Sequence, residues 1–211
     1  MVQKDKKIPS KPRGRPRGYD PDVALARVID RFWRAGYAAT SLDDLSEATG
    51  MNRPSLYAAF GDKRDLYIRA LTQYWDRTRP GVKEALTYDL PLREALRRLY
   101  GGALSVYLAG ETGPQGCFAI STATPEAVRD AKIRATLAGG LEELDQAFEA
   151  RIRFAKDKGE LPREADPAAL AMIASAALHT LALRSRAGAS RRSLEAIVGS
   201  AVDVICGRGK A

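Results

Sequence analysis

The feature that most constrains the fold is the helical spacing of apolar residues, which recurs along almost the whole chain. In the first clear run, Leu25, Val28, Ile29 and Phe32 fall on one face of a helix, and Gly36 ends the run. No stretch shows the alternation of β-branched and polar residues that is typical of strands. The pattern therefore predicts an all-α protein.

Residues that start and stop helices divide the N-terminal part into short elements. One helix begins at Asp20-Pro21, a second follows Thr40-Ser41 and ends at Gly50, and a third runs from Asn52 to Gly61, after which Asp62 caps a fourth. The tight turn at Gly50-Met51 is typical of a helix-turn-helix, whose last helix enters the major groove of DNA. Any small three-helix bundle would show similar caps, so that alternative stays open.

The remaining signals predict further helices separated by one clear loop at residues 110–116. Pro91 starts a fifth helix, and a short apolar segment covers residues 117–120. Thr124-Pro125-Glu126 then starts a long helix that Gly159 ends, Asp166-Pro167 starts an alanine-rich helix, and a last helix follows Gly188. The apolar run at residues 168–183 is shorter than the about 20 residues of a membrane span, so we expect a buried helix and no membrane partner.

The positive charge gathers at the N-terminus. Residues 1–18 carry seven basic residues and one acidic residue, whereas the whole chain has a net charge of +8. A basic arm beside a nearly neutral body favours a polyanionic partner, either nucleic acid or an acidic membrane. Arg13, Arg15 and Arg17 stand among glycine and proline, as in an AT-hook, and are predicted to enter a minor groove. A solvated tail with a purely electrostatic attraction is the alternative.

Composition excludes several classes of site. Two cysteines and one histidine cannot build a disulfide scaffold, a zinc finger or a multi-histidine metal site. We find no phosphate-binding loop, nucleophile elbow or catalytic triad, so the sequence predicts no enzyme, no metal and no cofactor. Without a secretory signal, a cytoplasmic protein is expected.

Residues 36–45 (GYAATSLDDL) and 50–63 (GMNRPSLYAAFGDK) closely resemble the N-terminal domain of TetR/AcrR-type transcriptional repressors. The resemblance covers about residues 20–75. It implies an all-helical homodimer with a helix-turn-helix DNA-binding domain and a C-terminal domain for ligand binding and dimerisation. The predicted domains are an arm at 1–18, a DNA-binding domain at 19–65 and a C-terminal domain at 66–211. The implied function is a repressor of a palindromic operator, released by a small inducer; a non-specific architectural DNA binder is the alternative.

The resemblance also places the DNA contacts. Arg53 can donate two hydrogen bonds to a guanine, and Tyr57 and Lys63 can reach phosphates, although core packing of Tyr57 and a merely solvated Lys63 remain alternatives. Ala58 and Ala59 are shorter than the family's usual residues, so Arg53 and the arm should carry more of the affinity. The predicted DNA-binding residues outside the arm are Thr40, Ser41, Arg53, Pro54, Ser55, Tyr57 and Lys63.

Two sets of C-terminal residues are predicted to bind partners. For dimerisation, small and apolar residues of the last two helices form the set Ala171, Ala174, Ser175, Ala177, Leu194, Ile197, Val198 and Ala201, with closure of the monomer core as the alternative. For an apolar or aromatic inducer, the set is Tyr74, Trp75, Tyr100, Tyr107, Cys117, Phe118, Phe148 and His179, each of which could instead be core.

Cys117 supports a second alternative function. At the N-terminus of a short helix its pKa would fall and the thiol would become reactive, which is what a thiol- or electrophile-sensing regulator needs. A small buried side chain is the other interpretation.

Overall fold

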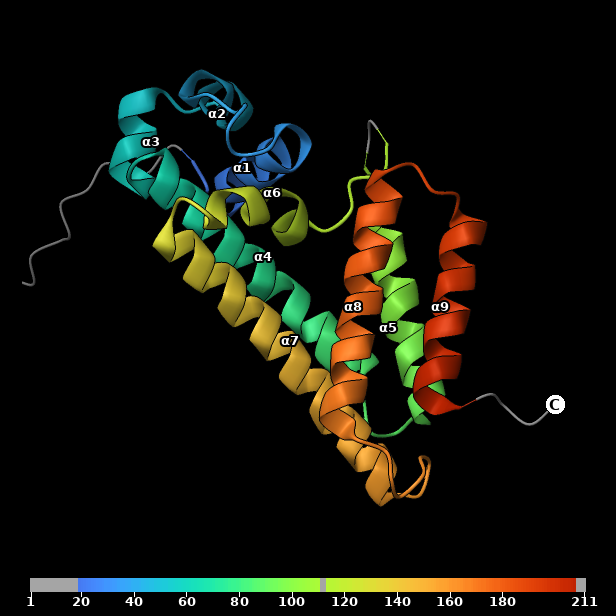
Figure 1. Cartoon of the computed structure of the whole chain (residues 1–211). Helices are drawn as coiled ribbons and strands as arrows, with labels where there is room; N and C mark the ends of the chain where they lie inside the picture. Colours follow the sequence, from blue (N-terminus) through green and yellow to red (C-terminus); the bar gives the residue numbers. More distant parts are fainter. Residues whose placement is uncertain (1–18, 111–112, 208–211) are drawn as a thin grey trace, which may run out of the picture.

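The computed structural model describes residues 19–110 and 113–207, and this part of the chain is helical. Figure 1 shows the helices in chain order: α1 (Pro21–Ala35), α2 (Leu42–Thr49), α3 (Arg53–Phe60), α4 (Lys63–Ala85), α5 (Leu92–Tyr107), α6 (Phe118–Ala127), α7 (Ala131–Asp157), α8 (Pro167–Arg186) and α9 (Arg191–Cys206). The predicted all-α fold is confirmed.

The predicted caps fix the ends of the first helices. The side chains of Asp20, Ser41, Asn52 and Asp62 each accept a hydrogen bond from a backbone N–H in the first turn of α1, α2, α3 and α4. These bonds satisfy donors that a helix start otherwise leaves unpaired. The three short helices therefore begin and end close to where the sequence predicted.

One predicted boundary is wrong. Thr124-Pro125-Glu126 does not start the long helix, because α6 continues through Pro125 to Ala127. The long helix α7 begins instead after Asp130, whose carboxylate accepts hydrogen bonds from the backbone N–H groups of Lys132 and Ile133. These hydrogen bonds satisfy donors that the helix start otherwise leaves unpaired, whereas a proline in the first turn merely lacks one of those donors.

Helices α4 and α7 run side by side through the middle of the molecule (Figure 1). At one end α1 and α3 pack on α4 and α2 packs on α1 and α3, and at the other end α5, α8 and α9 form a second bundle. The aromatic rings of Phe32, Tyr67 and Phe118 join the first group to α6. The predicted domain boundary between residues 65 and 66 falls in the first turn of α4, so both parts share that helix.

Helix α8 is long and apolar enough, by length and composition only, to qualify as a membrane-spanning segment among the described residues. It packs against α5, α7 and α9, which is what a core helix of a bundle does. Its free face is nevertheless apolar, with Met172, Ile173 and Leu183 exposed, and Val204 is exposed on α9.

The predicted dimerisation residues divide between two faces. Ala171, Ala174, Ser175 and Leu194 are buried inside the monomer, so they close its own core and do not present a surface. That part of the prediction is wrong, because the small residues of α8 turn toward α5 and α7. The other four, Ala177, Ile197, Val198 and Ala201, are half-buried, so a role for them in a dimer stays a prediction.

Candidate nucleic-acid interface

One face of α3 is free of the protein core. Leu56 and Phe60 are buried, as predicted, in a helix that packs on α2 and α4, whereas Arg53, Pro54 and Tyr57 are exposed. Tyr57 is 46% exposed, so its alternative as a core residue is wrong. Ser55 is half-buried, and its backbone N–H donates to the capping Asn52. The exposed face combines one cation with one phenol at the start of a helix.

Arg53 already has an acidic partner, which sequence reasoning missed. Its Nε donates to Oδ1 of Asp43 on α2 at 2.7 Å, and its Nη2 contacts the second carboxylate oxygen. These hydrogen bonds raise the pKa of Arg53 above its usual value. Nε and Nη2 of the guanidinium thus form a bidentate pair with the carboxylate. The two acceptors on the edge of a guanine could accept the same pair of hydrogen bonds. An acid ten positions before the arginine was the only signal in the sequence.

The start of α2 is built around its cap. Ser41 accepts from the backbone N–H of Asp44, and the Asp44 carboxylate accepts from the backbone N–H and the hydroxyl of Ser41. These bonds, with a further one from Arg31, lower the pKa of Asp44 to about 2. Ser41 is exposed beside the α3 face.

Thr40 is predicted to meet a phosphate through the free backbone N–H groups at the start of α2. The residue is 1% exposed, and its hydroxyl donates to the backbone carbonyl of Gly36 at 2.6 Å. Its backbone N–H donates to the carbonyl of Tyr37 at 3.3 Å, so in this conformation it is not free, and a DNA contact by Thr40 stays a prediction.

Lys63 stands at the first position of α4, next to the end of α3. Its ammonium lies over the ring of Tyr37, 4.4 Å from the centroid, and burial lowers its pKa. A cation over an aromatic ring is held in place by the negative face of that ring. Lys63 is thus a positioned charge, which argues against the alternative of a merely solvated one. The predicted arm contacts, Arg13, Arg15 and Arg17, lie outside the described residues.

Most of the predicted ligand-binding residues are core. Tyr74, Tyr100, Tyr107, Phe118 and Phe148 are buried, and the hydroxyl of Tyr100 donates to the backbone of Ala174. His179 is half-buried, and burial lowers its pKa. None of these lines the cavity between α4 and α7 or the hollow beside Trp33 and Arg186. They fill the space between helices because aromatic rings at helical spacing contribute most by packing.

Cys117 is buried as well. It precedes the first residue of α6, as predicted, and its sulfur lies 3.1 Å from the hydroxyl of Tyr74. Burial raises the pKa of the thiol, although backbone and phenol hydrogen bonds act in the other direction. The prediction of a lowered pKa is wrong, because the loss of water outweighs the helix terminus.

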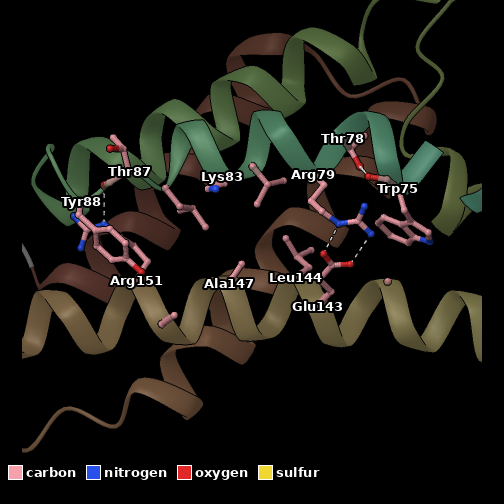
Figure 2. A pocket seen from close by; sticks show the side chains of 14 residues that line it. Trp75, Thr78, Arg79, Lys83, Thr87, Tyr88, Glu143, Leu144, Ala147 and Arg151 are labelled. Carbon is pink, nitrogen blue, oxygen red and sulfur yellow. Dashed lines mark hydrogen bonds and ion pairs between the residues drawn. The ribbon is translucent and has the colours of Figure 1, made fainter. Parts of the chain in front are cut away.

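Trp75, also a predicted ligand-binding residue, lines a cavity. This cavity lies between α4 and α7 and has a volume of about 470 Å³ (Figure 2). Its wall also includes Arg79, Lys83, Glu143 and Arg151, which the sequence analysis did not select. Arg151 had one signal: it is a lone cation on the apolar face that contains Phe148 and Ile152.

Known proteins match this architecture along its length. Residues 29–70 match the family described as bacterial regulatory proteins, tetR family, and residues 93–200 match the tetracyclin repressor-like C-terminal domain. The HTH-type transcriptional repressor ComR of Escherichia coli is 32% identical over 190 residues, which cover 90% of each chain. The HTH-type transcriptional repressor BdcR of Escherichia coli is 31% identical over 57% of this chain and 58% of its own.

A solved structure shows the same fold on DNA. A cysteine mutant of the TetR family transcriptional regulator CifR, crystallised with a 26-base-pair double-strand operator, superposes with a TM-score of 0.80. It is 31% identical, and the match covers 89% of this chain and 98% of that one. The exposed face of α3, the shared long helix α4 and both matched regions lead to one conclusion: the chain belongs to the TetR family of helix-turn-helix, DNA-binding transcriptional regulators, which are not enzymes.

Proposed function

We propose that this regulator is a homodimeric repressor that holds a palindromic operator with α3 and leaves it when a small molecule binds the C-terminal helices. The observation that carries the proposal is the exposed face of α3, where Arg53 and Tyr57 stand free of the core. The similarity to two repressors and to an operator-bound regulator supports it. Binding to operator DNA implies a cytoplasmic protein.

The apolar face of α8 and α9 supports the dimer. Met172, Ile173 and Leu183 on α8 and Val204 on α9 are large apolar residues exposed in the monomer. A second copy that covers the same face by a two-fold axis would remove them from water. Two α3 helices about 34 Å apart could then read successive turns of one face of DNA.

Helix α4 supports ligand control. Its first turn adjoins α3, and its later turns line the cavity, so one helix joins both sites (Figure 1). Arg64 at its start pairs with Asp130 at the start of α7, and Arg79 pairs with Glu143 further along α7. A ligand that moves α4 relative to α7 would therefore displace α3 and favour the conformation that does not fit DNA.

The first test is selection of genomic fragments by the purified protein, followed by affinity measurements on the selected fragment and on a scrambled one. A palindromic fragment should bind orders of magnitude more tightly than scrambled DNA near physiological salt. Arg53→Ala should lower affinity for the selected fragment about tenfold or more, because a bidentate pair contributes about 1–3 kcal/mol of discrimination. Arg97→Ala, on the distant helix α5, is the control. Equal affinities for both fragments would overturn the proposal.

The dimer is tested separately by sedimentation. Leu183→Glu places a charge in the proposed interface and should yield monomers. Val128→Glu places the same charge on an apolar residue that is 78% exposed beyond α6, and it should leave the dimer intact. A monomeric wild-type protein, or a dimer insensitive to Leu183→Glu, would contradict this interface.

A further inference from the structure

The cavity between α4 and α7 has the make-up of a small-molecule site. Its volume of about 470 Å³ lies within the range of about 300–1,000 Å³ that such sites occupy. Its middle is apolar, with Val82 and Leu86 on one wall and Leu144 and Ala147 on the other. In Figure 2 the cavity is elongated, with Trp75 at one end and Tyr88 and Arg151 at the other.

Arg151 brings a buried donor without a partner to one end. The residue is 1% exposed; its Nε donates to the carbonyl of Thr87 at 3.1 Å and its Nη2 to the carbonyl of Leu90 at 2.6 Å. Its Nη1 is buried and has no hydrogen-bond partner. An unpaired buried donor is unfavourable, so an acceptor supplied from outside would stabilise it.

The charges of the lining favour an anion at the same end. Arg79 pairs with both Glu143 and Asp76, so the end near Trp75 has no surplus of positive charge. Lys83 lies between Arg79 and Tyr88 along the cavity (Figure 2) and adds a second cation toward Arg151. The nearest acid to Arg151 is Glu160, 4.0 Å from Nη2 and thus not on Nη1. Positive charge therefore exceeds negative charge beside the unpaired donor.

We infer that this cavity binds an amphipathic molecule with a single carboxylate. The carboxylate accepts from Nη1 of Arg151 and pairs with Lys83, and the apolar body lies along the middle of the cavity toward Trp75. Gly140 and Arg151 on α7 are separated by about 16 Å along the helix axis, which suits an extended chain better than a compact ring system. The inference gives a chemical class to the ligand of the proposed function and rests on that function only for the effect on DNA.

The test measures binding of three probes to the full-length protein. The probes share one alkyl chain length and differ in the head group: dodecanoate, dodecanol and dodecyltrimethylammonium. Binding is followed at equilibrium by tryptophan fluorescence, with Trp75→Phe to identify the signal from the cavity. Dodecanoate should bind about tenfold more tightly than dodecanol, which corresponds to about 1.4 kcal/mol, and the cation should bind least. Equal binding of acid and alcohol, or no binding of dodecanoate, overturns the inference.

Four variants locate the site. Lys83→Met and Arg151→Lys should each reduce the preference for the acid, and Lys83→Met keeps the test valid if the Arg151 variant fails to fold. Arg79→Met lies in the same wall but removes a guanidinium already paired with acids, so the preference should stay. Ala147→Phe fills the cavity and should abolish binding of both probes. A preference that survives both Lys83→Met and Arg151→Lys, or binding unchanged by Ala147→Phe, overturns the inference.

DNA is added only afterwards, so the two proposals can fail separately. Release of operator DNA by dodecanoate, lost in Ala147→Phe, supports both. Tight, acid-selective binding without release supports the site and contradicts ligand control through it. If dodecanoate still releases operator DNA from Ala147→Phe, the site between α4 and α7 is contradicted, and the ligand acts through another site.

Discussion

The indole of Trp75 packs on α7 at a position where only glycine fits. A Cβ on Gly140 would lie 2.2 Å from the Trp75 ring, closer than atoms can approach. Gly140→Ala should therefore force the indole out of the cavity wall and destabilise the fold, although alanine is the better helix former. The measurements are the urea midpoint and the fluorescence maximum, which should shift to longer wavelength as Trp75 reaches water.

Gly139 is the matched control for this prediction. A Cβ there meets nothing within 4 Å, and the residue is exposed on the same helix. Gly139→Ala should raise the free energy of unfolding by about 0.5–1 kcal/mol. If both substitutions changed the free energy of unfolding equally, the contact with Trp75 would not be the reason that position 140 requires glycine.

The carboxylate of Asp43 would compete with DNA for Arg53. Its carboxylate occupies the guanidinium of Arg53, and the pair is largely exposed to solvent. The predicted contact of Arg53 with DNA requires DNA to replace this carboxylate. Asp43→Asn should therefore raise affinity for scrambled DNA by up to about fivefold, the limit set by exposed pairs of about 0.2–1 kcal/mol. Titrations at two salt concentrations test this. No change, or weaker binding, would mean that Asp43 instead holds Arg53 in its DNA-binding orientation.

At the scale of the element, α2 depends on its capping box, and this dependence has a pH signature. The pKa of Asp44 is about 2 in the folded protein and about 3.9 in an unfolded chain, so folding favours the carboxylate. Its contribution is complete above the unfolded pKa and disappears as the pH falls through the folded one, between about pH 4 and pH 2. Asp44→Asn should destabilise the protein at neutral pH and weaken the pH dependence of stability in that window.

Urea unfolding at about pH 6, 4 and 2 checks this prediction. Glu47→Gln, on the same helix but outside the cap, should preserve the wild-type pH dependence. Parallel curves for Asp44→Asn and the wild type would assign the acid sensitivity to other groups.

At the scale of the whole molecule, the DNA-binding end is tied to α8 through the loop before α6. Trp33 on α1 donates from Nε1 to the carbonyl of Gln115 at 3.0 Å, and Arg186 on α8 donates to the carbonyls of both residues. Hydrogen bonds from a charged donor contribute about 1.5–3 kcal/mol. Arg186→Met should therefore speed amide hydrogen exchange in α1, far away in sequence, while Arg184→Met leaves it unchanged. Faster exchange confined to α8 would contradict this coupling.

Much of the DNA-binding end could be predicted because its signals are local. Caps such as Asn52 and Asp62 specify helix starts by hydrogen bonds within one turn, and the exposed position of Arg53 follows from the same register. The Arg53–Asp43 pair and the burial of Thr40 depend on how α2 packs beside its neighbours, which no local pattern specifies.

The cavity between α4 and α7 was harder to predict because it depends on gaps between helices. The aromatic residues selected from the sequence fill the core, whereas the cavity lies where the small residues Gly140 and Ala147 face α4. For α8, the small residues predicted to form the dimer interface, such as Ala171 and Ala174, close the monomer core instead. Residue size alone does not tell which face a neighbour covers.

The separation between the α3 face and the exposed apolar face of α8 and α9 has a genetic consequence. In the proposed homodimer, a chain with an altered Arg53 would keep Leu183 and Val204 and would therefore still pair with a normal copy. Each mixed dimer would then have one intact α3 helix and would bind only one half-site of the palindrome. Alleles that damage α3 should thus be dominant over the normal allele, whereas alleles that charge the α8 face should be recessive, because their products never join a normal partner.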